Sequence, residues 1–109
     1  SGSDLGPVPR FPGMQRTRWE QNGTNATVEF EGRANFLDVL DHYRSGMAKL
    51  GYSEAVRAAS AKMESHEYTR NGERIQMELS QLTAGRVKVR IDALRAERAS
   101  AELEPSKNP

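Results

Sequence analysis

The chain has 109 residues, of which 36% are hydrophobic and 28% are charged, and its formal net charge is +1 at pH 7. This length gives room for one domain, and the low hydrophobic fraction predicts a small core. Near-balanced charge argues against a dedicated nucleic-acid or anionic-membrane binder, because both usually carry a basic excess. The absence of cysteine excludes disulfides, thiolate catalysis and cysteine zinc sites.

The N-terminal segment, residues 1–13, is rich in glycine and proline, which predicts extended, irregular chain. Ser1-Gly2-Ser3 is typical of residues left by cloning, so a native signal would have been removed with the sequence upstream of it. We expect Val8 and Phe11 to attach this segment to the domain. No stretch of the chain approaches the roughly 20 apolar residues of a membrane span.

Residues 14–21 and 25–31 are predicted to form a β-hairpin. Asn22-Gly23 between them is a strong tight-turn signal, since both residue types tolerate positive φ. Residues 25–31 alternate apolar and polar side chains, as a strand with one buried face requires.

Residues 35–50 carry the clearest helical signals. Asn35 is a good N-cap, and Asp38 lies near the positive end of the helix dipole. Gly51 suits the left-handed residue that ends many helices, and Gly46 in the helix interior predicts close approach to a strand. The apolar positions share one stripe and recur at spacings of four, three, four and three: Phe36, Leu40, Tyr43, Met47 and Leu50, widened by Val39 and Leu37.

The remaining strands are predicted at residues 62–70, 73–82 and 86–92, with a short strand or irregular connection at residues 53–61. The predicted fold is α+β, one amphipathic helix on an antiparallel sheet in the order β-β-α-(β)-β-β-β. The domain spans residues 14–92. Residues 93–109 form a polar C-terminal tail with helical propensity in part.

Three short motifs resemble a group of small extracytoplasmic domains in bacterial lipoproteins and secreted proteins. Val8-Pro9-Arg10-Phe11-Pro12-Gly13 is similar to the V-P-x-[YF]-P-G opening of that group, and His42-Tyr43-Arg44 and Leu50-Gly51-Tyr52 match its helix centre and helix end. The resemblance covers residues 8–92. It implies a periplasmic or cell-envelope location and a binding or structural role, and it implies no catalytic residues.

Metal binding and acid–base catalysis are the less favoured interpretations of the polar helix face. His42 lies near Asp38 and Asp41, but a metal site needs three or four convergent ligands. The two aspartates also serve the helix dipole, and His66 is interpreted as a half-exposed strand residue. We therefore expect no metal site, no cofactor and no catalytic residue, and the protein is predicted not to be an enzyme.

Nucleic acid is also a less favoured partner. Arg16 and Arg18 line one face of the first strand, but strand alternation places Trp19 on the opposite face, away from a basic groove. Acidic residues interrupt the basic strands, so a salt-bridged solvent face explains them better.

Large amphipathic side chains and one basic strand face are the candidate partner-binding residues. They are Phe11, Trp19, Tyr52, Tyr68, Arg86, Lys88 and Arg90. The leading hypothesis is a non-enzymatic cell-envelope domain that acts through a protein partner or self-association, with a homodimer included. The alternative is a small-ligand or single-stranded nucleic-acid-binding module that uses the sheet face or the helix–sheet groove.

Overall fold

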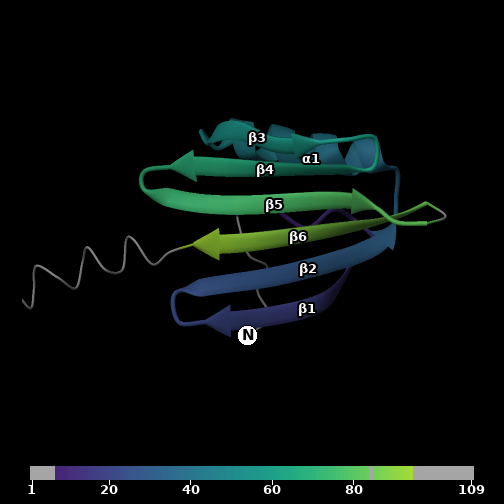
Figure 1. Ribbon diagram of the computed structural model, residues 1–109, viewed down its shortest axis with the longest axis horizontal. Coiled ribbons are helices and arrows are strands. Elements are labelled where there is room, and N and C mark those ends of the chain that lie inside the picture. Colours follow the sequence, from purple (N-terminus) through teal and green to yellow (C-terminus); the bar gives the residue numbers. More distant parts are fainter. Residues whose placement is uncertain (1–6, 84, 95–109) are drawn as a thin grey trace, which may run out of the picture.

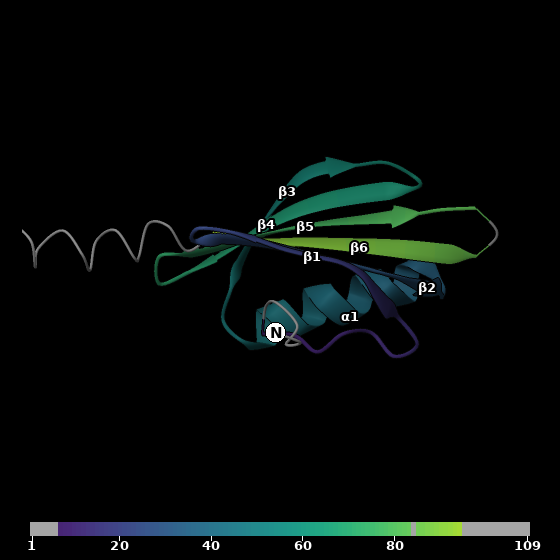
Figure 2. The same ribbon diagram turned by 90° about the horizontal axis from the view of Figure 1, so that it is seen from below.

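A computed structural model describes residues 7–83 and 85–94, with one helix packed on one side of a six-stranded antiparallel sheet (Figures 1 and 2). The strand order is β1-β2-β6-β5-β4-β3, so β1 and β3 are the two edges. This confirms the predicted α+β class. The elements are β1 (Gln15–Asn22), β2 (Asn25–Arg33), α1 (Phe36–Lys49), β3 (Ser53–Ala59), β4 (Met63–Arg70), β5 (Glu73–Gln81) and β6 (Arg86–Leu94).

The helix ends are where the sequence predicts them. The Asn35 side chain accepts a hydrogen bond from the backbone N–H of Asp38 at 3.1 Å, which satisfies one donor of the first turn. Gly51 has a φ of +87°, and the N–H of Tyr52 donates to the carbonyl of Met47 at 3.1 Å. The chain therefore reverses at the end of α1 through a glycine C-terminal cap.

The buried stripe of α1 differs from the prediction at two leucines. Leu37 is 68% exposed and Leu50 is 40% exposed. Leu37 follows the buried Phe36 by one residue, about 100° around the helix, and points away from the sheet. Leu50 follows the last helical residue, so its side chain leaves the stripe. The buried helix residues are Phe36, Val39, Leu40, Tyr43 and Met47.

A shift in register changes the faces of β1. Arg16 pairs with Phe30 and Arg18 with Glu29, so one extra residue is inserted between the two arginines. The Arg16 guanidinium consequently lies 5.6 Å from the Trp19 ring centroid. The prediction that both arginines face away from Trp19 is thus wrong for Arg16 and right for Arg18.

The tight turns follow the Asn-Gly signals with one adjustment. Asn71-Gly72 has positive φ at both residues, 50° and 82°, as the predicted turn requires. In the first hairpin Asn22 pairs with Asn25, so the turn residues are Gly23 and Thr24. This turn begins one residue later than predicted.

Two uncertain segments of the sequence are strands. The ambiguous stretch 53–61 contains β3, which pairs with β4 along one side. β6 continues through Ala93 and Leu94, two residues into the predicted tail, because Ala93 packs in the core at 6% exposure. The predicted tail beyond Leu94 and residues 1–6 lie outside the described residues.

Residues 7–13, here called the N-terminal strap, run along α1 before the chain enters β1 (Figure 2). Val8 is buried, and a Cβ built at Gly46 would lie 2.9 Å from both Val8 methyl carbons. Phe11 donates its N–H to the Tyr43 hydroxyl at 3.2 Å. Gly46 therefore marks close approach of the strap, and the predicted approach of a strand is wrong.

Gly46→Ala is expected to lower the free energy of unfolding by about 1–2 kcal/mol, because the new methyl group overlaps Val8. The same change in an open helix would stabilise by up to about 1 kcal/mol. Adding Val8→Ala should recover most of the loss that the first substitution causes. Urea denaturation of the single and double variants measures this coupling, and a Gly46→Ala protein as stable as the wild type would contradict the contact.

Candidate functional site

A groove of about 390 Å³ lies between α1 and the sheet near its β3 edge. Sheets twist, whereas a single helix is straight, so a helix cannot cover all six strands. Figure 2 shows β3 and β4 curving away from α1. The α1–β3 groove is lined by Leu37, Leu40, Asp41, Arg44, Ser45 and Ala48 from the helix, and by Tyr52, Glu54 and Tyr68.

Five polar side chains form a connected network at the wall of this groove, here called the Glu54 network. Arg44 on α1 donates two hydrogen bonds to the Glu54 carboxylate on β3, at 3.0 and 2.8 Å. The Tyr68 hydroxyl on β4 donates to the same carboxylate at 2.8 Å. His66 places Nδ1 3.0 Å from the Tyr68 oxygen and Nε2 2.8 Å from Glu64 Oε1. The network therefore connects α1 to β3 and β4.

The protonation states in this network suit structural bonding. The hydrogen bond from Arg44 lowers the pKa of Glu54 and raises the pKa of Arg44 itself. Burial, and then the hydrogen bond to Glu54, raise the pKa of Tyr68 above its ordinary value. Tyr68 is therefore a lasting hydrogen-bond donor and a poor base, and Glu54 is a poor proton donor at neutral pH.

Neither metal ligation nor a membrane span is indicated in the described part of the chain. Among residues 7–83 and 85–94, no three His, Asp or Glu side chains are grouped as ligands of a metal ion. Within the same ranges, no helix has the length and apolar character to cross a bilayer.

The predicted partner-binding residues lie in four separate places. Tyr52 and Tyr68 line the α1–β3 groove, although both side chains are largely buried. Phe11 belongs to the N-terminal strap, Trp19 belongs to β1 at the far edge, and both pack half-buried against the core. The three basic residues, Arg86, Lys88 and Arg90, alternate with buried residues of β6 and so lie on the side away from α1.

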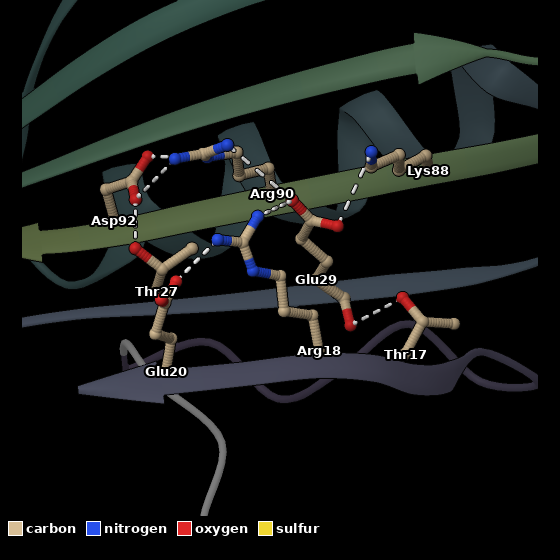
Figure 3. Close-up of polar contacts among 8 residues, drawn as sticks. All are labelled: Thr17, Arg18, Glu20, Thr27, Glu29, Lys88, Arg90 and Asp92. Carbon is tan, nitrogen blue, oxygen red and sulfur yellow. Dashed lines mark hydrogen bonds and ion pairs between the residues drawn. The ribbon is translucent and has the colours of Figure 1, made fainter.

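That side of the sheet, here called the open face, is covered by no described element. Glu29 on β2 is only 8% exposed because three cations surround it (Figure 3). Arg18 lies 3.4 Å from it, Lys88 3.4 Å and Arg90 3.6 Å. Arg90 also hydrogen-bonds Asp92, which raises the pKa of Arg90. A phosphate group on this face would compete with carboxylates already in place.

The sequence predicted a helix–sheet groove only for the alternative function, and of the residues that line it only Tyr52 and Tyr68 were among the predicted binding residues. Arg44 and Glu54 are ten positions apart and belong to different elements, so no local pattern joins them. One signal was available: Leu37 lies off the main apolar stripe, which is typical of an exposed apolar residue.

Comparison of the chain with protein-family models, with curated proteins and with solved structures gave no significant match. Function is therefore inferred from the groove, from the edge of β3 with which no described strand pairs, and from the open face.

Proposed function

We propose that this chain is a non-enzymatic, protein-binding domain of the cell envelope, and that it binds through the outer edge of β3 and the α1–β3 groove. The observation that carries this proposal is the exposure of all seven residues of β3. No described strand pairs with its outer edge. An unpaired edge presents backbone donors and acceptors to which an extended segment can add as a further strand.

The side chains beside this edge indicate the chemistry of the partner. On the helix side, Val56 is 52% exposed and Leu37 is exposed on α1 across the groove. On the open face, the Arg57 side chain is 63% exposed and shares the Glu67 carboxylate with Arg74. Because successive strand residues face opposite sides, an added segment that alternates apolar and acidic residues would complement both.

A flexible segment of another protein fits this edge better than a second copy of the chain. β3 has a shift in register between Val56 and Ala58. Such bulges twist an edge away from regular pairing, and two identical bulged edges would have to match each other. An unstructured peptide can instead follow the twist as it binds. A homodimer through β3 is therefore an alternative outcome of the binding test.

The cell-envelope location rests on the resemblance of the N-terminal and helix motifs to extracytoplasmic domains. The two motifs meet in space, since Phe11 donates to Tyr43 at 3.2 Å and Val8 contacts the helix nearby. This contact supports the interpretation that the N-terminal motif and the helix motif belong to one structural pattern, as the resemblance implies. The non-enzymatic role is supported by the Glu54 network, whose polar groups bond one another.

A small ligand in the α1–β3 groove is the second candidate. The groove volume of about 390 Å³ lies within the range of roughly 300–1,000 Å³ that is usual for small-molecule pockets. Single-stranded nucleic acid on the open face has less support, because the cations there are shared with carboxylates.

Selection from a random-peptide library on the immobilised domain tests the proposal. Enriched peptides are expected to alternate apolar and acidic residues, and Val56→Asp should weaken their binding at least about tenfold, or about 1.4 kcal/mol. The matched control is Leu82→Asp, at an exposed leucine that lies outside both β3 and the groove. Equal binding to both variants would contradict the proposal, and so would a selection that enriches the same peptides on the Val56→Asp domain. A dimer that Val56→Asp disrupts would favour a second copy as the occupant.

A further inference from the structure

We infer that His66 acts as a proton-controlled lock on β3, the strand that carries the proposed binding edge. This inference rests on the proposed function for its biological meaning, although the lock itself is a property of the free domain. His66 is 1% exposed and lies on β4, where it pairs with Val56 of the edge strand β3.

Both ring nitrogens of His66 face hydrogen-bond acceptors. Nε2 lies 2.8 Å from Glu64 Oε1, and Nδ1 lies 3.0 Å from the Tyr68 oxygen and 3.3 Å from Glu54 Oε2. The Tyr68 hydroxyl already directs its hydrogen to Glu54, so it offers Nδ1 a lone pair. Only the protonated imidazolium carries a hydrogen on each nitrogen, and it therefore satisfies every contact at once.

Loss of one proton from His66 forces a rearrangement with a defined outcome. The Glu64 carboxylate has no hydrogen to donate, so the remaining N–H stays on Nε2. Nδ1 then becomes an acceptor, and the Tyr68 hydroxyl, 3.0 Å away, is in reach to donate to it. If Tyr68 turns to Nδ1, its hydrogen bond to Glu54 on β3 is replaced by one within β4.

The charged and titratable groups around His66 set the direction of the effect. Glu54 faces it from β3, and Glu64 and Tyr68 face it from β4. From α1, Arg44 reaches the cluster through Glu54. On β5, the residue opposite His66 is the apolar Met77.

When His66 is protonated, the Tyr68 hydroxyl on β4 therefore stays hydrogen-bonded to Glu54 on β3. When His66 is neutral, this side-chain hydrogen bond between the two strands is lost. Tyr68 keeps its own proton at neutral pH, because burial and the hydrogen bond to Glu54 raise its pKa. A fixed edge binds an added strand with less ordering cost, so peptide binding is expected to weaken when His66 loses its proton.

Amide hydrogen exchange followed by NMR tests the lock without any partner. Over a pH series, the ring ¹⁵N shifts of His66 report when it passes from both nitrogens protonated to the Nε2–H tautomer. Protection of β3 amides should fall several-fold across that change, relative to β1 amides at the opposite edge, whose exchange corrects for base catalysis.

Tyr68→Phe removes the hydroxyl that changes partner, so β3 protection in this variant should lose its pH dependence. His42→Gln is the control, since His42 bonds the Pro9 carbonyl of the N-terminal strap and its replacement should leave the dependence intact. The inference is overturned if His66 keeps one protonation state over the whole pH range in which the domain stays folded, or if β3 protection does not follow the change in its ring ¹⁵N shifts. The wild-type titration decides this even if a variant folds poorly. Failure of peptide binding alone would count against the proposed function and leave the lock in place.

Discussion

Leu40→Asp is expected to unfold the domain, whereas Leu37→Asp should change the free energy of unfolding by less than about 0.5 kcal/mol. Leu40 is 7% exposed and packs in the core, while Leu37 is 68% exposed one turn earlier on the same helix. An ionised carboxylate without a partner in the core costs several kcal/mol, comparable with the total stability of about 5–15 kcal/mol for a small domain.

Leu37 provides a strict control because the substitution and the helix are the same. A carboxylate in the first turn of α1 is also favoured by the helix dipole, which offsets the lost apolar side chain. Circular dichroism and urea denaturation report the two stabilities. If both variants unfolded, or both were tolerated, the orientation of α1 on the sheet would be wrong.

Glu54→Ala is expected to cost about 1–2 kcal/mol of stability, because it removes the carboxylate that accepts two hydrogen bonds from Arg44. The effect should depend on pH. Arg44 lowers the pKa of Glu54 in the folded state, so the stabilisation is complete above the ordinary carboxyl pKa and is lost as the pH falls through the folded value. The wild type and the variant should therefore converge in stability in acid.

Glu20→Ala is the matched control, since Glu20 pairs with Arg18 and both side chains are about half exposed. Exposed pairs contribute little, so this change should cost less than about 0.5 kcal/mol. Denaturant titrations at neutral and acidic pH give both values. A Glu54→Ala protein as stable as Glu20→Ala at neutral pH would mean that the Glu54 network does not hold β3 in place.

The local signals predicted the local structure well. Asn35 and Gly51 delimit α1 as expected, and Asn71-Gly72 forms the expected turn. Each depends on a backbone preference that acts within a few residues. The wrong assignments have non-local causes. The register shift in β1 is set by pairing with β2. Gly46 is explained by its contact with Val8 of the N-terminal strap, a residue distant from it in the sequence.

The candidate site could not be predicted in the same way. Its groove exists because a twisted sheet carries β3 away from a straight helix, which is a property of the assembled fold. His66 reads as a half-exposed strand residue in the sequence, yet it is buried between two carboxylates from different strands. Aromatic and basic residues drew attention to Trp19 and Arg90, which lie on β1 and on the open face.

NMR chemical-shift mapping with a library-selected peptide tests the central claim most directly, because it identifies the surface that the partner covers. The claim predicts that the largest shifts fall on the amides of β3 and on Leu37 and Arg44 across the groove. New exchange protection along the outer edge of β3 should accompany them, as an added strand requires. Shifts centred on Lys88 and Arg90 of the open face, with β3 unchanged, would contradict it.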